Sequence, residues 1–208
     1  MSPSYNDSVF INCPFDADYR EHLEAIVFAI YRCGFYPVNA LAEDNALHNR
    51  LDKIQSQIEN CRYAIHDISR VQLNASGFPR FNMPFELGLF FGAKRFGNKT
   101  QKTKNALVFE GTRFSYQNYL SDLSGVDVKA HNNNAASILR NIRNWLSTSS
   151  RRKTIPGYNT IIKDFESFQT QLPAILTRLS LERDDLPFND LCVIIEEYLK
   201  SLLDKDGV

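Results

Sequence analysis

The sequence predicts a three-layer α/β fold with a central five-stranded parallel sheet, followed by a C-terminal helical extension. Two observations predict it: short apolar runs alternate with amphipathic helical patterns up to about residue 148, and no strand-like alternation follows residue 130. The composition agrees, because 43% of the 208 residues are hydrophobic and 23% are charged, as in ordinary globular proteins. The chain is therefore long enough to bury a substantial core.

Five short apolar segments are expected to form the strands. They cover residues 8–12, 36–41, 63–67, 105–109 and 126–130. Helices are expected between and after them, at residues 19–33, 47–60, 84–93 and 135–146. The first of these helices carries Leu23, Ile26 and Ile30 at helical spacing, and Gly34 follows as a C-cap. Because strands and helices alternate, the strands should be parallel.

A boundary is expected where the composition changes, at residues 147–156, which are rich in Ser, Thr and Arg. We therefore expect an α/β domain at residues 1–148 and a helical extension at residues 149–208. The extension should contain helical segments at residues 158–179 and 188–203, the first of them bent or broken at Pro173. These segments hold more aliphatic residues than two helices can bury together, so they should dock on the sheet domain or on a second subunit.

Charge and cysteine content narrow the class of protein. Lys plus Arg and Asp plus Glu each number 24, so the net charge of zero predicts neither a nucleic-acid partner nor an anionic membrane. The four cysteines lie far apart without a C-x-x-C pair, which predicts reduced thiols and no metal site. The first residues are polar, and no run approaches the roughly 18 apolar residues of a membrane span. These features predict a cytoplasmic protein.

The main candidate catalytic residue is Glu86, in the apolar segment NMPFELGLFFGA at residues 82–93. Pro84 suits the first helical position and Asn82 can cap from just outside, which would place Glu86 in the first turn. The helix dipole favours a negative charge there, so a capping role is the structural alternative. Residues 61–69 support a functional role for Glu86, because they are expected to form a buried strand that ends in a polar cluster. Open α/β sheets bind ligands beyond the ends of such strands.

Further candidates follow the first three strands. Asp67 is the second candidate catalytic residue, as a proton donor if its pKa is raised, or else a cap of the next turn. The candidates for substrate binding are amides, carboxylates, aromatic rings and arginines: Asn12, Pro14, Phe15, Asp44, Arg70, Arg80, Phe81 and Asn82. Amides would bind hydroxyl groups, aromatic rings would stack on a base, and arginines would hold phosphate. His66 should point to the opposite face from Asp67, so we leave it outside the site.

Three short motifs resemble known families. The segment NCPF at residues 12–15, the strand that ends at Asp67 and PFELG at residues 84–88 resemble the nucleoside 2-deoxyribosyltransferases, whose nucleophile is a glutamate at such a helix start. The same order of elements is similar to the Toll/interleukin-1 receptor (TIR) domain, whose NAD-cleaving members use a glutamate there. Both belong to one flavodoxin-like fold group, and the resemblance covers residues 8–148. The chain as a whole resembles bacterial stand-alone TIR-like proteins, which often serve antiviral defence.

The resemblance implies an N-ribosyl bond hydrolase or transferase that acts through Glu86. NAD or a related nucleotide would be its substrate rather than a cofactor, and a homo-oligomer would be expected. Two alternatives stay open: a non-catalytic TIR-like module for nucleotide binding, signalling or assembly, and a nucleoside 2-deoxyribosyltransferase. The first alternative predicts that Glu86→Gln leaves function nearly intact, and the second predicts base exchange between free deoxynucleosides.

Overall fold

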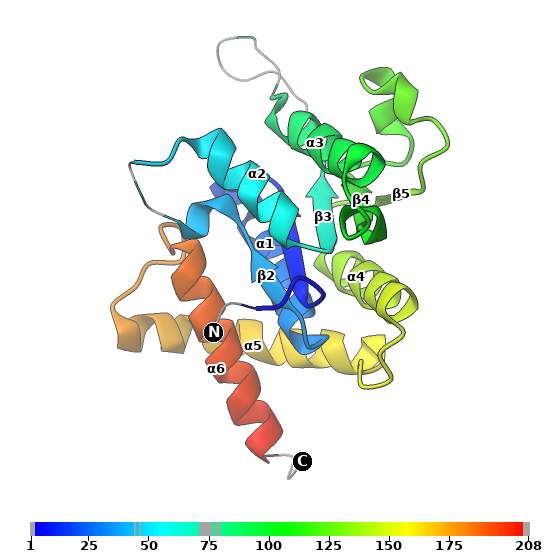
Figure 1. The fold of residues 1–208 in the computed structure, drawn as a ribbon. Coiled ribbons are helices and arrows are strands. Elements are labelled where there is room, and N and C mark those ends of the chain that lie inside the picture. Colours follow the sequence, from blue (N-terminus) through cyan, green and yellow to red (C-terminus); the bar gives the residue numbers. More distant parts are fainter. Residues whose placement is uncertain (1–2, 44, 46, 71–76, 78–79, 206–208) are drawn as a thin grey trace. The chain divides into compact units, whose positions relative to one another are not determined.

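The computed structural model describes residues 3–43, 45, 47–70, 77 and 80–205 (Figure 1). Its internal contacts divide the chain into two compact units. The first unit comprises residues 1–14 and 38–134, and the second comprises residues 15–37 and 135–208. The division differs from the expected domains at residues 1–148 and 149–208, because two helices that we assigned to the α/β domain belong to the second unit.

The strands form a five-stranded parallel sheet with the order β2-β1-β3-β4-β5, which confirms the predicted fold class. Their bounds are Ser8–Asn12 for β1, Tyr36–Val38 for β2, Tyr63–Asp67 for β3, Asn105–Glu110 for β4 and Val128–Ala130 for β5. Every residue of β1 and β3 is buried, as expected for central strands of a parallel sheet. The second strand is shorter than predicted, because Asn39 leaves it to accept a hydrogen bond from the Leu41 amide (2.7 Å) and so caps a short 3-10 helix.

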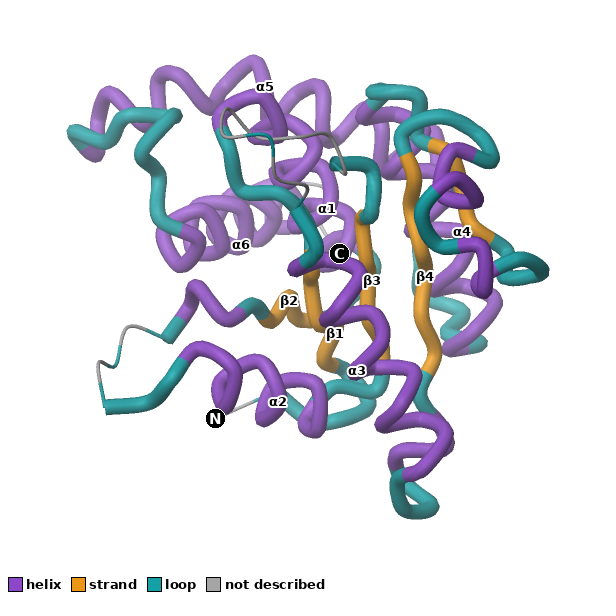
Figure 2. The backbone as a smooth tube through the Cα atoms, turned by 90° about the horizontal axis from the view of Figure 1, so that it is seen from above, coloured by secondary structure: helices purple, strands orange, loops and turns teal. Residues whose placement is uncertain are grey.

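Two helices of the first unit, α2 (Arg50–Asn60) and α3 (Asn82–Phe96), pack beside each other over β1 and β3 (Figure 2). Their shared core contains Phe10, Ile54, Ile58, Ala64 and Phe90. A second cluster joins α3 to β4 and to the 3-10 helices at Ser115–Asn118 and Ser121–Leu123. Its buried members are Ile68, Met83, Leu87, Val108 and Tyr116. Apolar packing therefore holds α3 on two sides.

Lys104 is a buried cation inside this unit. Its ammonium group donates hydrogen bonds to the carbonyl oxygens of Ile58 and Cys61 at the end of α2, and lies 4.8 Å from the centre of the Phe90 ring. A cation is favoured at a helix C-terminus and over an aromatic face. Burial lowers the pKa of Lys104 to about 8. Lys104 thus ties the end of α2 to the middle of α3.

The second unit is helical. It contains α1 (Arg20–Arg32), α4 (Ala135–Ser150), α5 (Tyr158–Leu179) and α6 (Phe188–Lys205). Phe28 of α1 packs against Phe165 and Phe168 of α5, with ring centres 5.3 and 5.5 Å away, and against Tyr198 of α6 at 6.4 Å. The C-terminal helices therefore dock on α1 and α4, as their surplus of aliphatic residues predicts.

Two local predictions for these helices have different outcomes. Gly34 ends α1 as expected, because its φ of 79° permits hydrogen bonds from its own amide to Tyr31 (2.8 Å) and from Phe35 to Ile30 (3.0 Å). Of the two outcomes expected at Pro173, a bend or a break, the break is wrong, since α5 runs through Pro173 as one helix. Buried Leu172 and Leu176 flank Pro173, so packing compensates for the missing backbone hydrogen bond.

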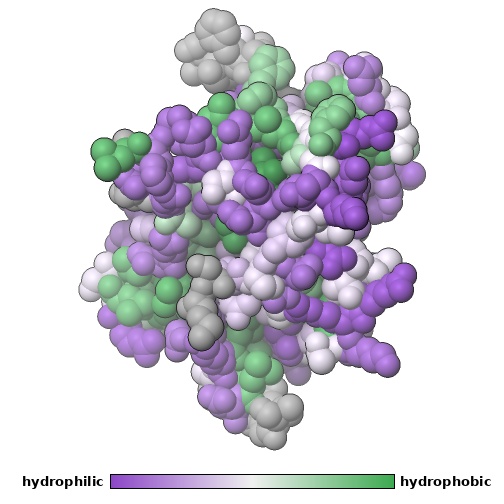
Figure 3. All heavy atoms as spheres, in the orientation of Figure 1, coloured by the Kyte–Doolittle hydropathy of each residue, from purple (hydrophilic) through white to green (hydrophobic). Residues whose placement is uncertain are grey.

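The outer surface is mostly polar on the face drawn in Figure 3, where hydrophobic atoms form small groups among hydrophilic ones. Within the described ranges, no helix combines the length and the apolar character needed to cross a bilayer. All four cysteines are buried, and none of them forms a disulfide with another described residue.

Candidate functional site

Glu86 lies further inside its helix than the sequence predicts. Helix α3 begins at Asn82, with Phe81 at the N-cap and no side-chain capping bond, so Pro84 is its third residue and Glu86 its fifth. The expected cap at Asn82 is therefore wrong. The helix starts earlier because the Phe85 amide bonds to the Phe81 carbonyl (2.9 Å), and Pro84 still falls where no amide hydrogen is needed. Since dipole effects fade beyond the first turn, capping no longer explains Glu86.

The surroundings of Glu86 are unusual for a carboxylate. Glu86 is only 8% exposed. Within the part of the chain that the structure describes, its carboxyl group has neither a hydrogen bond nor an ion pair. Burial raises the pKa of Glu86 to about 7, against a smaller opposing effect of the positive charge on Arg50. Burial therefore favours the protonated form of Glu86 well above the ordinary carboxyl range. Carboxyl groups perturbed in this way are typical of functional sites.

Asn12 and His66 lie at the ends of β1 and β3 and contact α3, the helix that carries Glu86. These two residues are paired in the register of β1 and β3, so their side chains share one face of the sheet. The Asn12 side-chain nitrogen lies 2.9 Å from His66 Nδ1 and donates to the Met83 carbonyl at 2.9 Å. The His66 ring packs edge-on against Phe90, with 5.3 Å between ring centres. Glu86 thus lies on the turn of α3 between two residues that contact the sheet, Met83 and Phe90.

Asn12 has a structural role that the sequence did not predict. It is only 3% exposed, and its amide nitrogen is engaged by His66 and Met83. With these hydrogen bonds, Asn12 holds the start of α3 against the sheet. Binding of substrate hydroxyls by Asn12 stays a prediction.

His66 is the residue that the sequence-based prediction left outside the site. Alternation along β3 gave its face correctly, but only the register with β1 shows that it meets Asn12.

Asp67, the last residue of β3, contacts the loops that follow β3 and β5. Its Oδ1 accepts a hydrogen bond from the Ser69 amide (2.8 Å), which is the turn cap considered as the alternative to catalysis. Its Oδ2 lies 3.2 Å from His131 Nε2, and both side chains are buried. His131 Nδ1 accepts from the Asn133 amide (3.0 Å), so the ring proton sits on Nε2, facing Asp67. Asp67 therefore links the loops after β3 and β5, and this arrangement does not support its predicted role as proton donor to the Glu86 site.

The remaining predicted binding residues are placed as follows. Arg80, Phe81 and Asn82 are exposed and lead directly into α3, with the Phe81 residue 62% exposed. Phe85, one turn further on, is 54% exposed. Arg70 is half-buried and Pro14 is buried, whereas Asp44 lies outside the described residues. Phe15 is half-buried and belongs to the second unit. The structure thus brings an arginine, aromatic rings and an amide together on the segment that enters α3.

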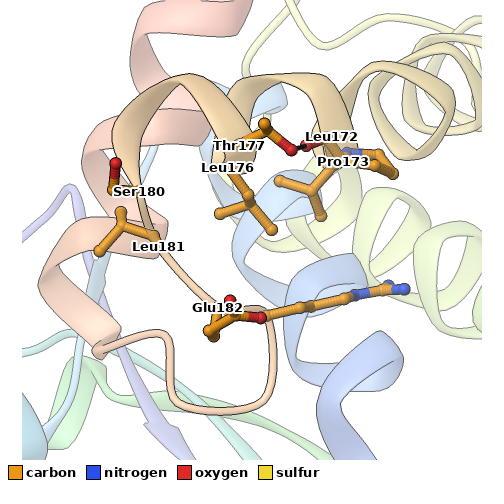
Figure 4. Close-up of a pocket in the computed structure, with 8 residues that line it drawn as sticks. Leu172, Pro173, Leu176, Thr177, Ser180, Leu181 and Glu182 are labelled. Atoms are coloured by element: carbon orange, nitrogen blue, oxygen red, sulfur yellow. Dashed lines mark hydrogen bonds between the residues drawn. The ribbon is translucent and has the colours of Figure 1, made fainter.

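Each unit contains a cavity that Glu86 does not line. A cavity of about 240 Å³ lies between α3 and the segment at residues 119–123, on the helix face of Pro84, Leu87, Gly88 and Phe91. In the second unit, a cavity of about 470 Å³ lies beside the end of α5 (Figure 4). Leucine side chains line much of the second cavity, and Thr177 on its wall donates a hydrogen bond to the Pro173 carbonyl (2.9 Å). Because Glu86 lines neither cavity, the candidate site is defined by Glu86 and its neighbours.

Comparison with known proteins adds no relative. The chain matches no protein-family model, and neither the curated proteins nor the solved structures include a significant match. The interpretation of the site therefore depends on its residues and their geometry.

The raised pKa of Glu86 predicts a specific dependence of stability on pH. Between the ordinary value of 4.5 and about 7, the folded chain binds more protons at this carboxyl than the unfolded chain. The free energy of unfolding should therefore fall as the pH rises through this window, by a total of about 3 kcal/mol. Glu86→Gln keeps the shape and removes the charge, so it should be more stable than the wild type at pH 8, with little difference at pH 4.

Urea unfolding of both proteins across this pH range measures the effect. The difference between the two curves isolates Glu86 from the other titrating groups. Parallel curves from pH 4 to pH 8 would show that Glu86 titrates normally in the folded protein.

Proposed function

We propose that the chain is an enzyme that breaks an N-ribosyl bond, with NAD or a related nucleotide as its substrate and Glu86 as the reacting carboxylate. The observation that carries the proposal is the state of Glu86: it is buried, lacks a bonding partner within the described residues and has a pKa of about 7. Structural carboxylates are normally paired when buried, as Glu110 is with the amides of Phe114 and Tyr116. The resemblance of the PFELG motif to two glycosyl-transferring or NAD-cleaving families supports the same conclusion.

A single carboxylate is sufficient for this reaction. As the bond between the ribose anomeric carbon and the base nitrogen breaks, its electron pair leaves with the nitrogen and the sugar becomes oxocarbenium-like. The negative charge of Glu86 stabilises the sugar cation or forms a transient ester with it. Water then adds to the anomeric carbon and releases a proton. Burial favours this step, because an unpaired charge acts more strongly where water is excluded.

The identity of the leaving group favours NAD over a neutral nucleoside. The nicotinamide ring of NAD is cationic while it is bonded and leaves as a neutral molecule, so no general acid is required. A neutral purine would need a proton, and the candidate proton donor Asp67 is engaged by Ser69 and His131. The exposed rings of Phe81 and Phe85 can stack on a base, and Arg80 precedes them as a phosphate ligand.

A substrate panel tests the proposal. The purified chain is incubated separately with NAD, with a deoxynucleoside and with a nucleoside monophosphate, and release of the free base is followed by chromatography. We expect nicotinamide from NAD. Base exchange in a mixture of free deoxynucleosides would identify a deoxyribosyltransferase instead. Nucleotide binding without release of any base would contradict catalysis and indicate a binding or signalling module.

A further inference from the structure

His66 is a buried histidine with an unexplained polar atom. Its side chain is fully buried and contacts the rings of Phe10 and Phe90, with ring centres 6.0 and 5.3 Å away. Within the residues that the structure describes, its Nε2 atom has no hydrogen-bond partner. An apolar side chain would avoid the cost of burying this group. The histidine must therefore be favoured by what its other nitrogen does.

The hydrogen bonds define the proton positions. The Met83 carbonyl can only accept a hydrogen bond, so the atom of the Asn12 amide that contacts it must be the nitrogen and not the oxygen. The same nitrogen lies 2.9 Å from His66 Nδ1, which must therefore be the acceptor. The ring is neutral and carries its proton on Nε2. Burial supports this state, because it lowers the pKa of His66 to about 3.

The chain of contacts leads to the turn that carries Glu86. His66 binds Asn12, and Asn12 binds the carbonyl of Met83, three residues before Glu86. His66 also packs against Phe90, four residues after Glu86. Residues three and four apart lie on the same side of a helix, so His66 holds the α3 turn both before and after Glu86.

We propose that His66 is a positioning residue for Glu86, acting through its hydrogen bond to Asn12 and its contact with Phe90. Its catalytic consequence rests on the function proposed above, but its effect on the surroundings of Glu86 does not. Without the acceptor at Nδ1, the Asn12 amide loses one of its two partners, and the first turn of α3 is held less firmly to the ends of β1 and β3 through the remaining bond to Met83. Glu86 then becomes more accessible to water, which favours its carboxylate form.

The test compares two substitutions of His66 with a matched control in the full chain. His66→Leu removes the acceptor, whereas His66→Asn places an amide oxygen near the position of Nδ1. Tyr119→Phe is the control, because it removes a partly buried hydrogen bond to the Ile68 carbonyl (2.8 Å) beside the cavity that α3 lines with Pro84 and Leu87. The readouts are the titration of the Glu86 carboxyl, followed by carbon NMR, and the KM and kcat of base release.

We expect His66→Leu to shift the titration midpoint of Glu86 from about 7 toward 4.5 and to lower kcat about tenfold with little change in KM. His66→Asn should restore most of both values, and Tyr119→Phe should change neither. A folded His66→Leu protein with an unchanged Glu86 titration would overturn the proposal. If that variant does not fold, Asn12→Ala cuts the same link from the other side, and the same titration decides. A wild type that releases no base would contradict the proposed function only, since the titration still tests positioning.

Discussion

The substitution Glu86→Gln is expected to lower the rate of base release at least about 100-fold. Glutamine has almost the same shape, so the packing around Met83 and Phe90 should persist. Its neutral amide can neither balance the positive charge of an oxocarbenium-like sugar nor attack the anomeric carbon. The loss should therefore appear in kcat, with substrate binding largely preserved. Steady-state kinetics on the substrate identified by the panel measure it.

A matched control separates this effect from a general loss of negative charge. Glu59 lies exposed on α2 in the same unit, so Glu59→Gln removes the same charge at a distance from the proposed reaction. We expect it to retain wild-type activity. If Glu86→Gln is as active as Glu59→Gln, then Glu86 is not the reacting carboxylate.

The second large effect is expected on stability, in the second unit. Glu24 is fully buried in α1 and receives hydrogen bonds from Arg183 Nε (2.9 Å) and Nη2 (2.5 Å) and from Gln169 (2.7 Å). Arg183→Met would leave this carboxylate buried without its cation. Such losses cost about 3 to 5 kcal/mol, and we expect the lower end because the Arg183 side chain is 43% exposed and partly screened by water.

Urea unfolding of Arg183→Met beside Arg178→Met measures this contribution. Arg178 is exposed near the end of α5, so its substitution should change the unfolding free energy by less than about 0.5 kcal/mol. Combining Arg183→Met with Glu24→Gln should recover part of the lost unfolding free energy, because the double variant no longer buries the Glu24 carboxylate without its cation. Equal stabilities for the two single variants would show that the Glu24–Arg183 pair contributes little.

Much of the fold could be predicted because the apolar pattern of this chain is regular. The bounds of β1, β3 and α5 agree with the prediction, since buried strands and long amphipathic helices have clear periodicity. Predictions failed where local contacts of single residues determine whether a strand or a helix ends. Asn39 ends β2 early by capping the next turn, and the packing of α5 carries it through Pro173.

The candidate site was predictable only in part. The sequence pointed to Glu86, but it placed the residue in the first turn, because Pro84 marks the start of a helix only approximately. The opposite faces of His66 and Asp67 followed from alternation. Their partners did not, because the contacts with Asn12 and His131 depend on strand register and loop geometry. Sequence periodicity does not specify either of these.

The direct measurement is a carbon NMR titration of the Glu86 carboxyl in the wild-type chain, assigned by comparison with Glu86→Gln. The proposed function and the positioning by His66 both depend on a buried carboxyl group that has no hydrogen-bond or ion-pair partner among the residues that the structure describes. We predict a titration midpoint near 7. A midpoint near the ordinary 4.5 would show a solvated or paired carboxylate and would contradict the proposed role of Glu86.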